Sequence, residues 1–144
     1  MRLVLDTCVI VSAFRSLNGA SRGLVDLFDL GRYEILLSTA LLLEYEDVLS
    51  RPEHMRVHNF SISEIGEVLD TLSARAGHVS LYYDWKPQLR DANDELVLAV
   101  AINGSADAIV THNTTDFLPA APMFRIQSIQ AGVSSEFEDD EGQV

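Results

Sequence analysis

Hydrophobic residues in this chain appear first as a short unbroken run and later as stripes at helical spacing. The opening run, Leu3 to Leu5, meets a single carboxylate at Asp6 and continues from Thr7 into a second apolar segment. So short a run predicts a buried strand that ends at Asp6 and a helix that begins near Thr7. Ligands bind at the carboxyl ends of strands in open parallel sheets, so Asp6 is the first candidate for a site.

The rest of the pattern predicts strands that alternate with helices. Further strands are expected over residues 33–37, 78–82, 108–111 and 124–129. Helices are expected over residues 21–30, 40–49, 61–77 and 91–102, with a short helix or an irregular loop over 53–60. This alternation predicts an α/β fold: a single three-layer domain with a mainly parallel central sheet of four to five strands flanked by helices.

Composition agrees with one folded domain. The chain has 144 residues, of which 47% are hydrophobic, enough for a core of its own. We expect residues 1–130 to form the domain. Residues 131–144 are small, polar and acidic, which is typical of a disordered tail.

The expected location is the cytoplasm. No apolar run approaches the roughly 20 residues that cross a bilayer, and the opening residues lack the basic and long apolar regions of a signal peptide. The lone Cys8 cannot form an internal disulfide, which agrees with a reducing compartment. We therefore expect no membrane association.

Charge argues against a general nucleic-acid binder. The net charge is −12, and phosphate affinity comes largely from Lys and Arg. Nine of the ten basic residues are Arg, which suits bidentate phosphate contacts, although solvated surface is the ordinary role of any one of them.

Four acids lie where packing alone would not select a carboxylate. Asp6 ends an apolar strand, and its alternative role is to cap the helix that follows. Glu44 lies on the flank of an apolar helix stripe, although such a glutamate is commonly just solvated. Asp94, with Asp91 three residues earlier, enters an apolar helix, where acids also offset the helix dipole. Asp116 follows a strand across a short loop, where a turn residue is the alternative.

Together these four acids predict a cation site. Three of them fall at strand ends or helix starts that a parallel sheet places at its carboxyl edge, and Glu44 follows the second strand. Carboxylates that share a site repel one another unless a divalent cation relieves the repulsion. Oxygen ligands favour Mg²⁺ or Mn²⁺ over zinc. Such a cluster can activate water for an in-line displacement at a phosphodiester.

The same residues resemble the PIN-domain (PilT N-terminus) family, in particular the VapC-like ribonucleases that are toxins of toxin–antitoxin pairs. The resemblance keeps order and spacing over about residues 2–129. It is carried by Leu3-Val4-Leu5-Asp6-Thr7, Asn18-Gly19-Ala20-Ser21, Leu41-x-x-Glu44-Tyr45, Arg90-Asp91-x-x-Asp94 and Thr111-x-Asn113-x-x-Asp116-Phe117.

The resemblance implies a metal-dependent ribonuclease that acts on single-stranded RNA. Its catalytic carboxylates fall on Asp6, Glu44, Asp94 and Asp116, and we expect Asp6, Asp94 and Asp116 to bind Mg²⁺ or Mn²⁺ while Glu44 orients or deprotonates water. Supporting positions fall on Thr7, Asp91, Thr111 and Asn113. Homodimers and a small antitoxin partner are also implied.

Two departures from the family pattern bear on activity. Cys8 replaces the Asn that usually follows Asp-Thr, which is expected to remove a polar partner from Asp6. Asn113 stands where some members carry an acid, which leaves that half of the site one charge lighter. Neither departure removes the four carboxylates, but both leave room for weak metal binding or low activity.

Other readings of the residues stay open. The main rival is a PIN-like module that binds RNA or protein without cutting it. An aspartate-nucleophile phosphatase is disfavoured because Cys8 replaces the second Asp it needs and the only lysine is Lys86. A Cys8 nucleophile paired with His112 is disfavoured because Cys8 lies in apolar sequence.

Overall fold

A computed structural model of the chain describes residues 1–15, 33–81, 92–112 and 125–128. Several predictions from the sequence therefore lie outside the described residues: the helix over 21–30, the positions Asp91, Asn113 and Asp116, and the acidic tail over 131–144. No helix in the described ranges is long and apolar enough to cross a membrane.

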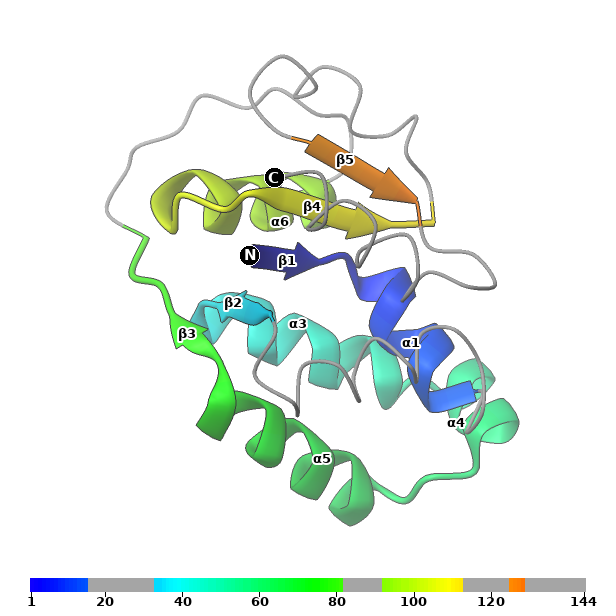
Figure 1. The fold of residues 1–144 in the computed structure, drawn as a ribbon. Helices are drawn as coiled ribbons and strands as arrows, with labels where there is room; N and C mark the ends of the chain where they lie inside the picture. Colours follow the sequence, from blue (N-terminus) through cyan, green and yellow to red (C-terminus); the bar gives the residue numbers. More distant parts are fainter. Residues whose placement is uncertain (16–32, 82–91, 113–124, 129–144) are drawn as a thin grey trace.

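The sheet has five strands, and every strand pairing in it is parallel (Figure 1). The order across the sheet is β3-β2-β1-β4-β5. The strands are β1 (Arg2–Leu5), β2 (Glu34–Leu37), β3 (Gly77–His78), β4 (Ala108–Thr111) and β5 (Arg125–Ser128). The predicted α/β class with a parallel sheet is confirmed.

Helices connect and cover these strands. They are α1 (Thr7–Arg15), α3 (Thr39–Leu49), α4 (Pro52–His58), α5 (Ile62–Arg75) and α6 (Ala92–Asn103). Helix α1 packs on α3, α4 and β4, and α6 packs on β1, β2, β4 and α3. Residues 53–60, for which a loop had been an alternative, lie mostly in α4.

Side-chain caps fix where two of the helices begin. The hydroxyl of Ser38 accepts from the Leu41 amide at 3.0 Å, which starts α3 directly after β2. Ser61 and Glu64 form a capping box that starts α5. From the sequence, Ser38 or Thr39 could cap the first of these helices and Ser61 or Ser63 the second; the structure selects Ser38 and Ser61.

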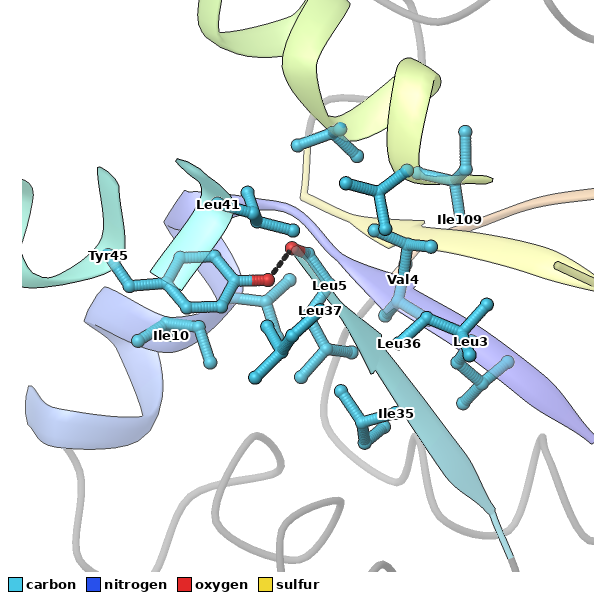
Figure 2. Close-up of a cluster of buried hydrophobic side chains, with 14 of the residues drawn as sticks. Leu3, Val4, Leu5, Ile10, Ile35, Leu36, Leu37, Leu41, Tyr45 and Ile109 are labelled. Atoms are coloured by element: carbon cyan, nitrogen blue, oxygen red, sulfur yellow. Dashed lines mark hydrogen bonds between the residues drawn. The ribbon is translucent and has the colours of Figure 1, made fainter. Parts of the chain in front are cut away.

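The core lies between β1, β2 and the helices that cover them (Figure 2). Leu3 and Val4 are fully buried and Leu5 is 2% exposed, as a strand covered on both faces requires. Leu36, Leu41 and Leu98 bring β2, α3 and α6 into the same cluster. This packing holds the carboxyl end of β1 rigidly in place.

Two details differ from the sequence pattern. The third strand was predicted over 78–82, but β3 covers only Gly77 and His78, because its partner β2 ends at Leu37 where Ser38 begins the next helix. The sequence spacing puts Val68 in one apolar stripe with Ile65 and Leu69, yet Val68 is 41% exposed, while Ile65 and Leu69 are buried. The neighbouring elements therefore cover only part of the apolar stripe of α5.

Candidate active site

The order of strands creates a switch point between β1 and β4. From β1 the chain moves outward through β2 to β3, and it then returns to place β4 on the other side of β1. Open α/β sheets bind ligands at such a point, beyond the carboxyl ends of the strands. Asp6 follows β1 and Thr111 ends β4, so both residues lie there.

The backbone of Asp6 is held from two sides. Its amide donates to the Val110 carbonyl at 2.9 Å, which continues the pairing of β1 with β4. Its carbonyl accepts from the Val9 amide at 3.0 Å, which begins α1. Strand and helix therefore fix the position of Asp6, whose side chain has little freedom because the residue is only 4% exposed.

Neutral groups alone donate to the Asp6 carboxylate within the described part of the chain. Oδ1 accepts from the Thr7 amide at 2.8 Å. Oδ2 accepts from the Thr111 hydroxyl at 2.7 Å and from the Cys8 thiol at 3.3 Å. Burying an ionised carboxylate is unfavourable unless its charge is balanced, so the Asp6 carboxylate is suited to binding a cation.

Cys8 belongs to this cluster, which corrects one expectation from the sequence. The thiol was expected to leave Asp6 without a polar partner, but Sγ lies 3.3 Å from Oδ2 and 3.7 Å from the Thr111 hydroxyl. The His112 amide donates to the same sulfur at 3.4 Å. A weak S–H donor thus takes the place of an amide.

The thiol is not an activated nucleophile. Burial, and then the negative charge of Asp6, raise the pKa of Cys8 to about 11. A nucleophilic cysteine needs the opposite shift, toward a thiolate at neutral pH. His112 reaches Cys8 through its backbone amide. The geometry therefore does not support a Cys8–His112 pair as a nucleophile and its base.

Tyr45 supports the site in a way that the sequence reasoning missed. Its hydroxyl donates to the Leu5 carbonyl, the last one of β1, and the whole side chain is buried (Figure 2). Burial, and then the charges of Asp6 and Cys8, raise the pKa of Tyr45 well above its usual value. Tyrosine in an apolar stripe was a usable signal, because a buried hydroxyl needs a partner.

Glu44 precedes Tyr45 on α3 and carries a buried oxygen that has no hydrogen-bond partner in the described structure. The residue is half-buried, while the neighbouring acids Glu46 and Asp47 are exposed, as the helical spacing predicted. An unpaired buried carboxylate oxygen is unfavourable on its own. The unpaired Glu44 oxygen is suited to binding a cation or an ordered water.

Asp94 lies in the first turn of α6, is half-buried and interacts with another residue. Asp116, the fourth predicted acid, is outside the described residues, as are Asp91 and Asn113. Within residues 1–15, 33–81, 92–112 and 125–128, no three His, Cys, Asp or Glu side chains group closely enough to hold one metal ion. The convergence of all four acids remains a prediction.

An open groove of about 400 Å³ begins beside this cluster. Thr7 and Cys8, which both contact the Asp6 carboxylate, line one part of it. Ser12 and Arg15 of α1, His54 of α4 and His112 after β4 line the rest, together with Val11 and Val48. The groove gives a ligand space next to the residues that hold Asp6.

Comparison with known proteins gives one family and one fold. A family model described as PIN domain matches residues 2–115. A chain of the crystal structure of VapBC2 from Rickettsia felis, bound to a DNA fragment from its promoter, superposes with a TM-score of 0.63 at 18% sequence identity; the match covers 90% of this chain and 100% of that one. At that identity the likeness shows the fold. No curated protein matches the sequence.

Proposed function

This chain belongs to the PIN domain family, and on that basis we propose that it is a divalent-metal-dependent endoribonuclease. The proposed reaction is hydrolysis of phosphodiester bonds in single-stranded RNA. The proposed biological role is that of the toxin in a type II toxin–antitoxin pair in the cytoplasm.

The observation that carries the proposal is the buried Asp6 carboxylate at the switch point of the sheet. Its donors are an amide, two hydroxyls and a thiol, and no Lys or Arg pairs with it in the described structure. The buried Oε1 of Glu44 has no hydrogen-bond partner in the described structure. This donor set fits a hard cation such as Mg²⁺ or Mn²⁺.

We assign roles to the four acids on this basis. Asp6, Asp94 and Asp116 would hold the cation, and Glu44 would orient or deprotonate the attacking water. When bound, Mg²⁺ or Mn²⁺ would supply Lewis acidity toward the phosphodiester.

The remaining residues position these acids. Thr7 and Thr111 fix both oxygens of the Asp6 carboxylate, at 2.8 and 2.7 Å, so its orientation is set before any ligand arrives. Asp91 and Asn113 are proposed to support the second half of the site. Tyr45 anchors α3, and with it Glu44, to the end of β1.

The partners are also proposals. The VapBC2 structure contains a complex on promoter DNA. By analogy of fold, we propose that this chain forms a homodimer and is inhibited by a cognate antitoxin protein. A module that binds RNA or protein without cleaving it is the competing function, and Cys8 on the Asp6 carboxylate favours it, since a thiol is a weaker donor there than an amide.

The test is cleavage of a panel of labelled single-stranded RNAs by the purified protein in Mg²⁺, Mn²⁺ or EDTA. Asp94→Asn serves as the loss-of-function variant and Asp70→Asn, on α5 and away from the switch point, as its matched control. Cleavage that requires metal, survives in Asp70→Asn and disappears in a folded Asp94→Asn protein is the expected result. A folded wild-type protein that binds RNA and cleaves none of it with any metal would establish the non-cleaving module instead.

A further inference from the structure

We propose that Arg15, held by His54, binds a backbone phosphate of the RNA strand beside the Asp6 site. This inference rests on the proposed ribonuclease function. Both side chains line the groove that begins at Thr7 and Cys8, the residues in contact with the Asp6 carboxylate. The ligand is thus another phosphodiester of the strand whose bond is cut.

The contact between the two side chains orients the arginine. Arg15 Nη2 lies 3.2 Å from Nδ1 of His54. A guanidinium has only donors, so in this contact Nδ1 of His54 is the acceptor. His54 therefore fixes one edge of the guanidinium without neutralising its charge.

Arg15 differs from Arg2 and Arg51 in its partner. Arg2 pairs with Glu34 at 3.6 Å, and Arg51 pairs with Asp47 at 3.1 Å. Arg15 forms no ion pair with any described residue, and its hydrogen bond is to His54. No described acid offsets its positive charge, and its fork of donors matches a phosphate.

The composition of the groove points to the same ligand. Its described lining contains one arginine, two histidines and no acid, in a chain whose net charge is −12. The thiol and hydroxyls that also line it are neutral. The net negative charge of the chain repels a phosphate backbone, so a groove whose described lining has no acid favours the approach of RNA beside Asp6.

The experiment combines cleavage kinetics with binding of a short labelled single-stranded RNA. Arg15→Gln is compared with Arg56→Gln, an exposed arginine of α4 that donates to the Pro52 carbonyl outside the groove. The expected result for Arg15→Gln is a rise in KM of about three- to tenfold with little change in kcat. The logarithmic salt dependence of binding should also fall by about 0.7, the loss of one phosphate contact.

A second pair of variants tests the role of His54 as a positioning residue. His54→Asn places an amide oxygen where Nδ1 lies and should keep the wild-type KM and salt dependence. His54→Ala removes the acceptor and should behave like a weaker form of Arg15→Gln. Equal effects of the two His54 variants would contradict the positioning role.

The outcomes separate this inference from the function on which it rests. If wild type cleaves or binds RNA and Arg15→Gln matches Arg56→Gln in KM and salt dependence, the phosphate assignment is wrong and the ribonuclease proposal stands. If wild type neither cleaves nor binds RNA with any metal, both are wrong. If wild type binds RNA without cleaving it, the salt dependence of binding alone tests whether Arg15 contacts a phosphate.

Discussion

The two edges of the sheet both carry acids at strand ends, but these acids differ in burial and in their partners. At the amino edge, Asp107 precedes β4 and its carboxylate accepts from the Arg2 amide at 2.7 Å, while the Arg2 guanidinium lies 3.6 Å from Glu34. At the carboxyl edge, Asp6 is almost fully buried and receives hydrogen bonds from neutral groups.

This difference separates an acid that links strands from one that can serve chemistry. The Asp107 carboxylate accepts from the Arg2 amide, and the Asp107 amide donates to the Arg2 carbonyl, each at 2.7 Å. These two hydrogen bonds tie β4 to β1 at an exposed position. Asp6 concentrates uncompensated negative charge where a parallel sheet binds ligands. An acid near a strand end can thus be assigned to a functional site only when its burial and its partners are known.

The largest expected difference between the edges is in catalysis. Asp6→Asn should lower the rate of RNA cleavage by about a hundredfold or more, because it removes the charge that the proposed cation needs. Asp107→Asn keeps an oxygen that can accept from Arg2 and should cleave like wild type. The measurement is single-turnover cleavage of one labelled RNA, with folding checked by circular dichroism. Equal loss in both variants would remove the distinction between the edges.

A second prediction concerns the buried thiol at the carboxyl edge. The pKa of Cys8 is raised from 9.0 to about 11, so at pH 8 the folded protein holds roughly a hundredfold less thiolate than the unfolded chain. Alkylation by iodoacetamide should be slower by that factor and should accelerate as the pH rises toward 11. Mass spectrometry against time measures the rate.

The cause of the Cys8 shift can be tested with the same assay. Asp6→Asn removes the second largest contribution to it and should increase the rate of alkylation, whereas Asp107→Asn should leave that rate unchanged. A folded wild-type protein that reacts as fast as the urea-unfolded chain would show that the thiol is neither buried nor beside a negative charge.

A smaller effect is expected where Tyr45 ties α3 to β1. Tyr45→Phe leaves the Leu5 carbonyl without its buried partner and should lower the free energy of unfolding by about 1–3 kcal/mol. Urea denaturation followed by circular dichroism measures it. Thr71→Ala, which removes an exposed hydroxyl that donates to the Glu67 carbonyl, should change stability by less than about 0.5 kcal/mol. Similar losses in the two variants would argue against an anchor at Tyr45.

The smallest effect is expected at Glu44. In EDTA, Glu44→Gln should raise the free energy of unfolding by about 1 kcal/mol, because a neutral amide is less costly to bury than an unpaired carboxylate oxygen. Glu46→Gln, at an exposed position two residues further on, should be neutral. Thermal unfolding of both variants measures the difference. A loss of stability specific to Glu44→Gln would mean that Glu44 already has a stabilising partner.

The sequence predicted most of the fold because it depends on local patterns. The unbroken run from Leu3 to Leu5 marked β1, and serines at Ser38 and Ser61 marked two helix starts. The length of β3 was not predictable, since it is set by where its partner β2 ends. Exposure of Val68 likewise depends on how the neighbouring elements pack around α5.

The candidate site was predictable only in part. The position of Asp6 at a strand end follows from the run of apolar residues before it, and the partial burial of Glu44 follows from helical spacing. The bond from Tyr45 to Leu5 joins residues 40 positions apart, and the contacts of Cys8 with Thr111 and His112 join residues 103 and 104 positions apart. The Arg15–His54 contact, 39 residues apart, carries no local pattern at all.

The most direct test of the account is a Mn²⁺ titration followed by electron paramagnetic resonance, in which the signal of free Mn²⁺ falls as the ion binds. Wild type and Asp107→Asn should bind Mn²⁺ alike, while Asp6→Asn and Asp94→Asn should bind it much more weakly. Binding that is unaffected by Asp6→Asn, or absent from folded wild-type protein, would contradict a cation site at the carboxyl edge of the sheet.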